Sequence, residues 1–250
     1  MQTSSVPTYL DWQFWAAIVA LLALVLSQLP PVHLLLRRAR LGVELYSRVQ
    51  LFQKVGNPNV QLHVILSNLG GRPIRVRALT MQLRRNGQDL CTLPAQNYLP
   101  TPGSSQTVLF TPFSIKPNEE WANIVTFLNY FAREDEKKYR AAERAIKVDI
   151  AEKRKALVDD KVLVEADPRL VAPFTEMFAK WFIWKPGEYE LRVNVKTDSD
   201  RSSVTKAYRF TLFESDSADL ESDKDDFKSG DGIYWTSGNH SGVLVQITEA

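Results

Sequence analysis

The chain of 250 residues contains a single cysteine, Cys91, and only three histidines. One cysteine cannot form an intrachain disulfide or a multi-cysteine zinc site. Histidines this far apart in sequence offer little to metal or Ser-His-Asp chemistry. The Walker A, GxGxxG, HExxH and GxSxG motifs are also missing. We therefore assign no catalytic residue, no cofactor and no metal ligand, and we expect a protein that is not an enzyme.

Cys91 and His63 both fall on strand-like runs, so a cysteine–histidine pair for nucleophilic chemistry is one interpretation. The alternative, which we favour, is a buried cysteine that packs as a small hydrophobic side chain.

An excess of one charge sign is missing too, because 31 basic residues face 29 acidic ones and the net charge is only +2. A dedicated nucleic-acid binder normally has a larger basic excess, so we expect no nucleic-acid partner. The content of hydrophobic residues (44%) and charged residues (24%) is ordinary for a globular protein. This composition excludes wholesale disorder, a collagen and a polytopic membrane protein. No small-molecule substrate is identified.

The longest hydrophobic run, WQFWAAIVALLALVLSQL, covers residues 12–29 and contains no charge. A bilayer core needs a helix of about 20 apolar residues. The run extends to residue 36, although two prolines at 30 and 31 should kink or end the helix. We predict a transmembrane helix over 12–36, after a short segment 1–11 and before a basic linker 37–42. The candidate residues at the membrane interfaces are Trp12, Trp15, Arg37, Arg38 and Arg40.

The main alternative to an anchor is a cleaved signal peptide, which requires a basic amino end. Here residues 1–11 contain no Lys or Arg, and Asp11 is acidic. A buried core helix, the other alternative, is rarely apolar on every face. Because Lys and Arg prefer the cytoplasmic side, we predict a single-pass protein of the inner membrane. Its N-terminus would lie outside and its C-terminal domain in the cytoplasm, with the inverted orientation as an open alternative.

The chain after residue 43 reads as an antiparallel β domain. Residues 60–66 alternate apolar and polar side chains, which indicates a strand with one buried face. A second strand over 74–83 changes phase after Ala78, which predicts a β-bulge. The Asn86-Gly87 pair predicts a type I′ hairpin turn. Further strands are expected at 106–110, 113–115, 122–127, 189–195 and 208–212, at the spacing of a β-sandwich.

Two short motifs carry a resemblance to a known fold. The segments NLGGRPI (68–74) and PGEYEL (186–191) resemble the early hairpin and the late strand of bacterial immunoglobulin-like β-sandwiches. The resemblance implies an Ig-like antiparallel sandwich built from residues 43–131 and 183–250. It implies no activity, because function lies in sites added to a fold.

Residues 132–182 interrupt the β pattern and predict a helical insertion. Residues 133–157 have no Gly or Pro and contain nine basic against six acidic residues. This helix is either solvated and packed by one edge, or a surface for a protein partner or anionic lipid. For the partner interpretation the candidate contacts are Arg140, Arg144 and Lys147.

A second helix should begin at Asp167-Pro168, with aspartate as the N-cap. It leads into an aromatic end that is either core packing or a contact with a partner, and whose candidate residues are Trp181, Phe182 and Trp184. The acidic segment 214–231 is interpreted as a solvated, mobile loop, and it does not fit a calcium-binding EF-hand. Residues 232–235 and 243–248 predict a terminal hairpin.

Together these features predict a membrane-anchored interaction or scaffolding protein whose cytoplasmic domain recruits or senses a partner. Anchoring would act by raising the effective concentration of whatever the domain binds. The alternative is a subunit of a membrane oligomer, such as a transport or envelope-defence assembly. In that case Ala16, Ala20 and Ala23 would permit close approach of neighbouring helices, and the partner would be a second copy.

Overall fold

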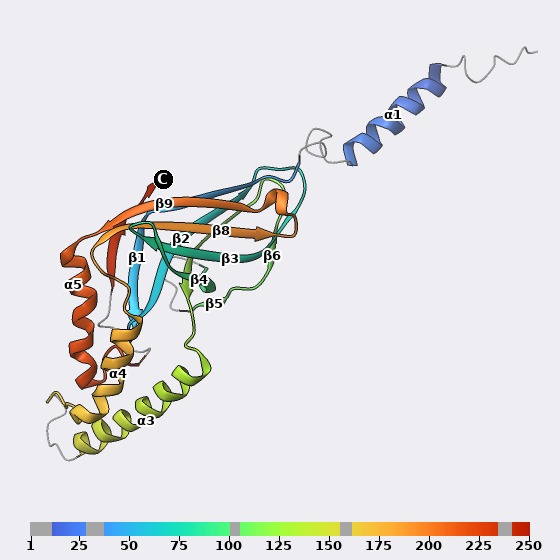
Figure 1. The fold of residues 1–250 in the computed structure, drawn as a ribbon. Coiled ribbons are helices and arrows are strands. Elements are labelled where there is room, and N and C mark those ends of the chain that lie inside the picture. The colour runs from blue at the N-terminus through green and yellow to red at the C-terminus, as the bar shows by residue number, and fades with distance from the viewer. Residues whose placement is uncertain (1–11, 29–37, 101–105, 156–161, 235–241) are drawn as a thin grey trace, which may run out of the picture.

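The computed structural model describes residues 12–28, 38–100, 106–155, 162–234 and 242–250. The described strands form one antiparallel sheet, and the helices of residues 133–181 lie at one end of it (Figure 1). The elements in chain order are α1 (Trp12–Gln28), β1 (Leu41–Lys54), β2 (Asn57–Asn68), β3 (Ile74–Arg85), β4 (Gln88–Leu99), β5 (Val108–Leu109), β6 (Phe113–Ile115), β7 (Glu120–Leu128), α3 (Arg133–Lys155), α4 (Pro168–Trp181), β8 (Gly187–Thr197), η2 (Asp200–Ser202), β9 (Val204–Leu212), α5 (Glu214–Ser222), η3 (Asp223–Ser229), β10 (Val243–Gln246) and β11 (Thr248–Glu249).

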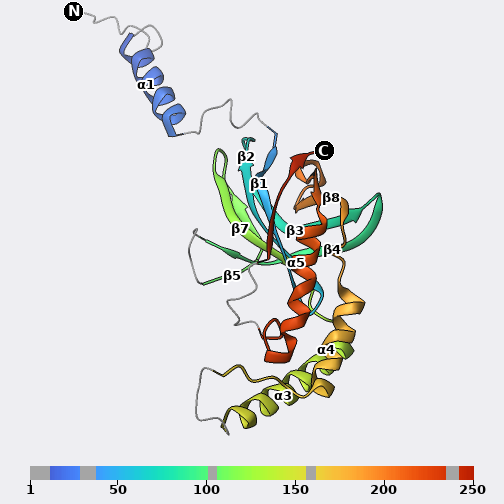
Figure 2. The same cartoon turned by 90° about the vertical axis from the view of Figure 1, so that its left-hand side faces the viewer.

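The strands form one continuous hydrogen-bonded path in the order β10-β1-β2-β7-β4-β3-β8-β9-β11. Strand β4 changes partner along its length, since its first half pairs with β3 and its second half with β7. The two ends of the path are joined by the last described segment, in which β10 pairs with β1 and β11 pairs with β9. Only Ile247 separates these two strands, so the sheet is nearly a closed barrel (Figure 2).

The prediction of a mainly β, antiparallel fold is therefore confirmed. The immunoglobulin-like sandwich is not confirmed, because a sandwich requires two separate sheets. Here the bent strand β4 carries the hydrogen bonding from one half of the sheet into the other.

The interior of the barrel is built from strand positions two residues apart. Val60, Leu62, Val64 and Leu66 of β2 are all buried, as their alternation predicts. The facing strands β3 and β8 contribute Leu79, Met81, Leu83, Leu191, Val193 and Val195. Burying each such side chain contributes about 1.5–3 kcal/mol, so this core is the main source of stability.

The turns agree in part with the sequence. Asn86 and Gly87 have φ angles of 50° and 82°, which confirms the type I′ turn between β3 and β4. The predicted bulge in β3 lies between Val76 and Ala78, slightly earlier than expected. The β1–β2 turn was not predicted, because it places the β-branched Val55 at a φ of 50°, a conformation that such residues rarely adopt.

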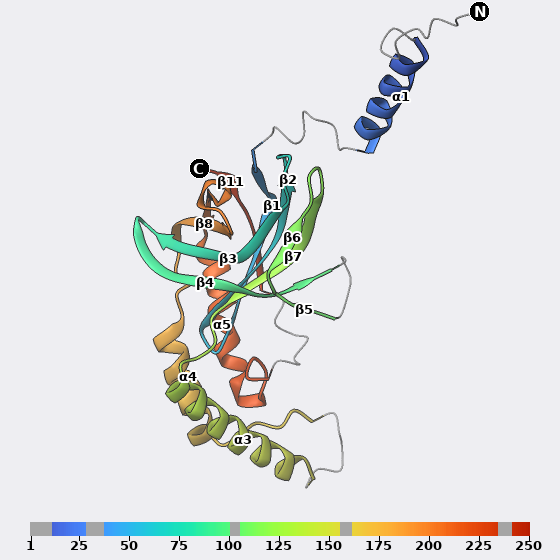
Figure 3. The ribbon, with the colours of Figure 1, turned by 90° about the vertical axis from the view of Figure 1, so that its right-hand side faces the viewer.

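The helical insertion is confirmed as α3 and α4, which lie at one end of the sheet (Figure 3). The carboxylate of Asp167 caps α4 by accepting a hydrogen bond of 2.8 Å from the Arg169 amide. The buried face of α4, with Phe174 and Phe178, is the apolar face that the sequence predicts. Gly56 lies against this helix so closely that an added Cβ would stand 2.6 Å from the Phe178 carbonyl oxygen.

The interpretation of residues 214–231 as a mobile loop is wrong, because the structure forms α5 and η3 there. Leu220 and Phe227 are buried, and the Phe227 ring centroid lies 6.0 Å from that of Phe178. The burial of these two apolar side chains holds the acidic segment 214–231 in an ordered conformation. The predicted terminal hairpin is also wrong, since β10 pairs with β1; residues 235–241 lie outside the described residues.

The helix α1 covers Trp12–Gln28, and the remainder of the predicted span to residue 36 lies outside the described residues. Within the described ranges, no helix combines the length and the apolar character needed to cross a membrane.

Candidate functional site

The helix α1 exposes nine large hydrophobic side chains, which include the predicted membrane residues Trp12 (73% exposed) and Trp15 (55%). At about 100° per residue these side chains cover most of the helix circumference. The remaining sector carries Ala16, Ala20 and Ala23, together with the polar residues Gln13 and Ser27. A helix of this kind has no charged face to offer to water.

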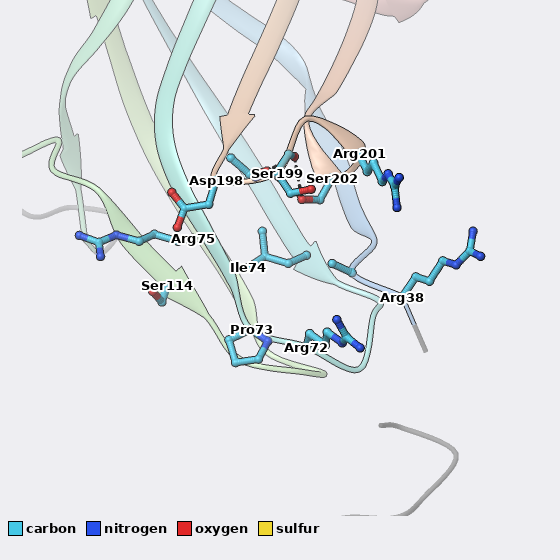
Figure 4. Close-up of a pocket in the computed structure, with 12 residues that line it drawn as sticks. Arg38, Arg72, Pro73, Ile74, Arg75, Ser114, Asp198, Ser199, Arg201 and Ser202 are labelled. Atoms are coloured by element: carbon cyan, nitrogen blue, oxygen red, sulfur yellow. Dashed lines mark hydrogen bonds between the residues drawn. The ribbon is translucent and has the colours of Figure 1, made fainter. Parts of the chain in front are cut away.

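Arg38 and Arg40, which were also predicted to lie near a membrane, precede β1 at one end of the barrel; Arg37 lies outside the described residues. Arg38 lines a cavity of about 960 Å³ that opens at this end. We call this cavity the arginine pocket, after Arg38, Arg72, Arg75 and Arg201 in its wall (Figure 4). Arg72 precedes β3, Arg75 is the second residue of β3, and Arg201 belongs to η2.

The backbone of the arginine pocket is fixed by buried polar groups. The amide of Asn68 donates hydrogen bonds to the carbonyl oxygens of Arg72 (2.9 Å) and Ile115 (3.0 Å), and its own oxygen accepts from Gly70 N (2.9 Å). An added Cβ on Gly70 would lie 2.4 Å from the Arg38 carbonyl oxygen, so the segments of Arg38 and Arg72 touch here. The NLGG turn therefore positions two of the four arginines.

The loop that carries Arg201 is fixed in a similar way. The Thr197 hydroxyl donates to the Ser199 carbonyl oxygen at 2.8 Å and lies 2.8 Å from the Ser202 hydroxyl. Thr197 and Ser202 are both buried, so these bonds are shielded from competition by water.

The pocket has one carboxylate in its wall, that of Asp198, and this group forms an ion pair with Arg77. The four arginine side chains are exposed, and none has an ion pair or side-chain hydrogen bond with another described residue. Figure 4 shows Arg38, Arg72 and Arg201 around one side of the cavity, while Arg75 points away from them. Planar guanidinium groups suit the oxygens of phosphates and carboxylates.

The predicted partner contacts on α3 are not equivalent. Arg140 donates to Glu136 (2.7 Å) and to Glu143 (3.2 Å), and Lys147 donates to Glu143 (3.1 Å). Arg144 is exposed and has no ion pair within the described part of the chain. It borders a shallow depression of about 420 Å³ that also contains Val148, which is 51% exposed. Arg144 is thus the one predicted contact whose charge is available.

The aromatic end of α4 belongs mainly to the core. Trp184 is fully buried and donates from Nε1 to the Phe52 carbonyl oxygen at 3.2 Å. Phe182 is buried and stacks on Phe178 with ring centroids 4.6 Å apart. Core packing, the alternative reading, therefore holds for Phe182 and Trp184. Trp181 packs against the same core and is the most exposed of the three.

A smaller cavity of about 280 Å³ lies between the sheet and α3 and was not found from the sequence. Its wall includes Lys54, only 7% exposed, whose ammonium lies 4.8 Å from the Tyr139 ring centroid. Burial lowers the pKa of Lys54 to about 8, and the nearby Glu143 opposes that shift. A lysine is normally expected at the surface, so nothing in its local sequence indicates this burial.

The cysteine–histidine interpretation is not supported. Burial raises the pKa of the Cys91 thiol to about 12, so the nucleophilic thiolate is hardly populated at neutral pH. His63 and Cys91 also belong to β2 and β4, which β7 separates in the sheet. Within the described residues, no group of three His, Cys, Asp or Glu side chains could hold a metal ion.

No known protein family matches this sequence, and no curated protein matches it. A crystal structure of a protein from Archaeoglobus fulgidus aligns with 8% identity and a TM-score of 0.29, over 67% of this chain and 94% of that one. The sporulation control protein Spo0M of Bacillus subtilis aligns with 11% identity and a TM-score of 0.26, over 76% of this chain and 55% of that one. Likeness at this level gives no indication of activity.

Proposed function

We propose that the protein is a membrane-attached binding module that recruits a protein partner through the exposed face of α3. The observation that carries the proposal is the apolar surface of α1, whose large side chains are exposed while the β domain buries a core of its own. An exposed apolar surface of this extent favours transfer out of water. The uncharged run at residues 12–29 supplies the membrane attachment.

The shape of the β domain supports membrane attachment at one end and partner binding at the other. Strand β1 starts beside the arginine pocket and ends at Lys54, which shares a cavity with Tyr139 and Arg140 of α3. Its 14 residues give a contour of about 46 Å, and Figures 1 and 3 place α3 at the end of the sheet opposite the amino end of β1. A domain that is attached near residue 38 therefore presents α3 away from its attachment point.

The exposed face of α3 selects a partner with acidic and apolar side chains. Arg144 supplies an unpaired positive charge, and Val148 beside it supplies an apolar contact. Membrane attachment raises the local concentration of a partner that is present at the same surface. By the positive-inside argument this surface is the cytoplasmic face of the inner membrane.

Flotation of the full-length protein with membranes tests the attachment. Leu21→Glu together with Leu24→Glu should move the protein into the soluble fraction, because two charges would enter the apolar surface of α1. Leu163→Glu is the matched control, since Leu163 is similarly exposed but lies between α3 and α4, far from α1 in the sequence. Flotation that persists in the α1 variant would refute the proposal, and extraction of the wild type by alkaline carbonate would show a peripheral rather than inserted helix.

Recovery of partners from detergent-solubilised membranes tests the α3 face. Arg144→Glu should abolish recovery of an acidic partner, whereas Arg169→Glu, an exposed arginine at the start of α4, should not. Equal recovery with both variants would remove α3 from the interface. If only copies of the protein return, the membrane oligomer becomes the better description of its function.

A further inference from the structure

We propose that the arginine pocket is a binding site for a phosphate group. A lipid headgroup and a free phosphate compound share this chemistry. The lipid source rests on the membrane attachment proposed above, and the free phosphate source does not. The pocket was not among the predicted sites, since its arginines come from segments that are far apart in the sequence.

The charges in the pocket leave a positive excess that the described residues do not neutralise. Asp198, the carboxylate in the wall, is held by Arg77, which lies outside the wall. The charge of Arg77 therefore cancels that of Asp198, and the four arginines of the pocket are left uncompensated. Guanidinium groups that line one cavity repel each other, and an anion beside them reduces this repulsion.

The geometry of the pocket fits a phosphate better than a single carboxylate. Arg38, Arg72 and Arg201 come from three separate segments on one side of the pocket (Figure 4), and a tetrahedral phosphate offers several oxygens in different directions. Ser114 and Ser199 also line the pocket, and Figure 4 shows Ser114 on the side of Arg75, away from the other three arginines.

The pocket is also organised before any ligand arrives. Asn68 is 1% exposed and holds the backbone at Arg72, while Gly70 lets the Arg38 segment approach closely. A site whose backbone is already ordered loses less entropy when a ligand binds.

The chain connects the pocket closely to α1. Arg38 follows Gln28 by ten residues, which span at most about 36 Å when extended. If α1 is inserted in a bilayer, the arginines stay within reach of the phosphates of the headgroup layer. Anionic lipids attract basic groups that are held at this depth.

The first experiment uses the full-length protein in a non-ionic detergent. Inorganic phosphate is titrated at constant ionic strength, with chloride as the replaced anion, and binding is measured from the broadening of the phosphorus-31 signal. Arg72→Ala with Arg201→Ala should weaken binding by at least about tenfold. Arg154→Ala with Arg169→Ala is the control of equal charge, because both arginines are exposed and lie on the helices at the other end of the domain.

The second experiment uses the full-length protein in nanodiscs of phosphatidylcholine with and without phosphatidylglycerol. Hydrogen–deuterium exchange at residues 72–76 and 197–203 should slow only in the anionic discs, and the pocket variant should lose this protection. A response in this arm identifies a lipid headgroup as the source, and a response to phosphate alone identifies a soluble phosphate ligand.

The phosphate site is refuted if neither arm responds, or if the control variant loses binding as strongly as the pocket variant. Flotation of the same samples reports on membrane attachment separately. A protein that floats but binds no phosphate refutes this inference and leaves the proposed function standing. A protein that binds phosphate but does not float with membranes refutes the proposed membrane attachment and leaves the phosphate site standing.

Discussion

The two ends of the β domain use arginine in opposite ways. At the helix end, Arg140 is paired with Glu136 and Glu143 on its own helix. At the other end, Arg72 and Arg201 have no such partner within the described residues. An arginine paired with an acid of the same helix is neutralised within the fold. A group of arginines with no such acid is neutralised only when an anion from solution or from a membrane binds. The arrangement of charges, rather than their number, distinguishes a structural surface from a binding surface.

The two ends also differ in what holds them together. The helix end rests on buried aromatic rings, such as Phe174, Phe178 and Trp184. The arginine end rests on side-chain hydrogen bonds from Asn68 and Thr197 to the backbone of its loops. Substitutions at the helix end should therefore mainly change the stability of the fold, and substitutions at the arginine end should mainly change anion binding.

The largest expected effect is on stability at the helix end. Trp184→Ala should lower the free energy of unfolding by about 3–5 kcal/mol, because it leaves a cavity in the core and removes the hydrogen bond to the Phe52 carbonyl oxygen. Arg72→Ala should change it by no more than about 0.5 kcal/mol, since the side chain is exposed. Urea unfolding of both variants makes the comparison. Similar losses in the two variants would show that the two ends are not built differently.

The next effect is a pH dependence that comes from Lys54. Its pKa of about 8 in the folded protein lies below the ordinary value of 10.5. Between these two pH values the unfolded chain binds more protons, so stability should rise with pH across this window, by on the order of 2 kcal/mol. Lys54→Met should abolish the rise. The measurement is best made from pH 7 to 9, where the rise should be about 1 kcal/mol. Above that range the raised pKa values of Cys91 and Tyr139 reduce stability, because their ordinary values are 9.0 and 10. If the stability of Lys54→Met rose equally with pH, other titrating groups would be its cause.

Removing the shared acid of the helix end should have a smaller effect. Glu143→Gln leaves Arg140 and Lys147 without a common partner and should destabilise the fold by about 1–2 kcal/mol. It should also lower the pKa of Lys54 further, because Glu143 raises it. Glu134→Gln, an exposed acid on the same helix, serves as the control. Thermal unfolding of the two variants at pH 7 should separate them, and equal melting temperatures would contradict a structural role for Glu143.

The smallest change in stability is expected at the ion pair beside the arginine pocket. Arg77→Ala should alter the free energy of unfolding by less than about 0.5 kcal/mol, because both partners are half exposed. It leaves the Asp198 carboxylate uncompensated at the pocket wall, so phosphate affinity should fall by about threefold. Asp198→Asn should raise it. The phosphorus-31 titration measures both changes, and a shift in the same direction for both variants would show that charge does not control binding.

Sequence periodicity predicted the parts of the fold that depend on local patterns. The alternation at residues 60–66, the Asn86-Gly87 turn and the Asp167 cap are all confirmed, because each depends on a few consecutive residues. The closure of the sheet was missed, since the pairing of β10 with β1 joins residues from the two ends of the domain. Leu220 and Phe227 were overlooked because acidic neighbours dominate the composition of their segment.

The candidate sites were predicted less well, for related reasons. Arg38 was recognised for its position after the apolar run, but its convergence with Arg72 and Arg201 depends on tertiary contacts. Trp184 was proposed as a partner residue because aromatic side chains are frequent in both cores and interfaces. Burial alone separates these two roles, and burial at this position is decided by the helices that cover it.

The position of the closing segment near the end of the described chain means that the barrel can close only late in synthesis. The outer edge of β1 at Arg48–Leu51 is paired by residues 243–246, about 200 residues later in the chain. While the ribosome makes the intervening chain, β1 presents an open strand edge, which is the kind of surface that promotes association between nascent chains. Closure must wait for almost the last described residues, and long-range pairing of this kind is slow. A chaperone that shields the edge of β1 during translation would therefore protect this protein at its most vulnerable stage.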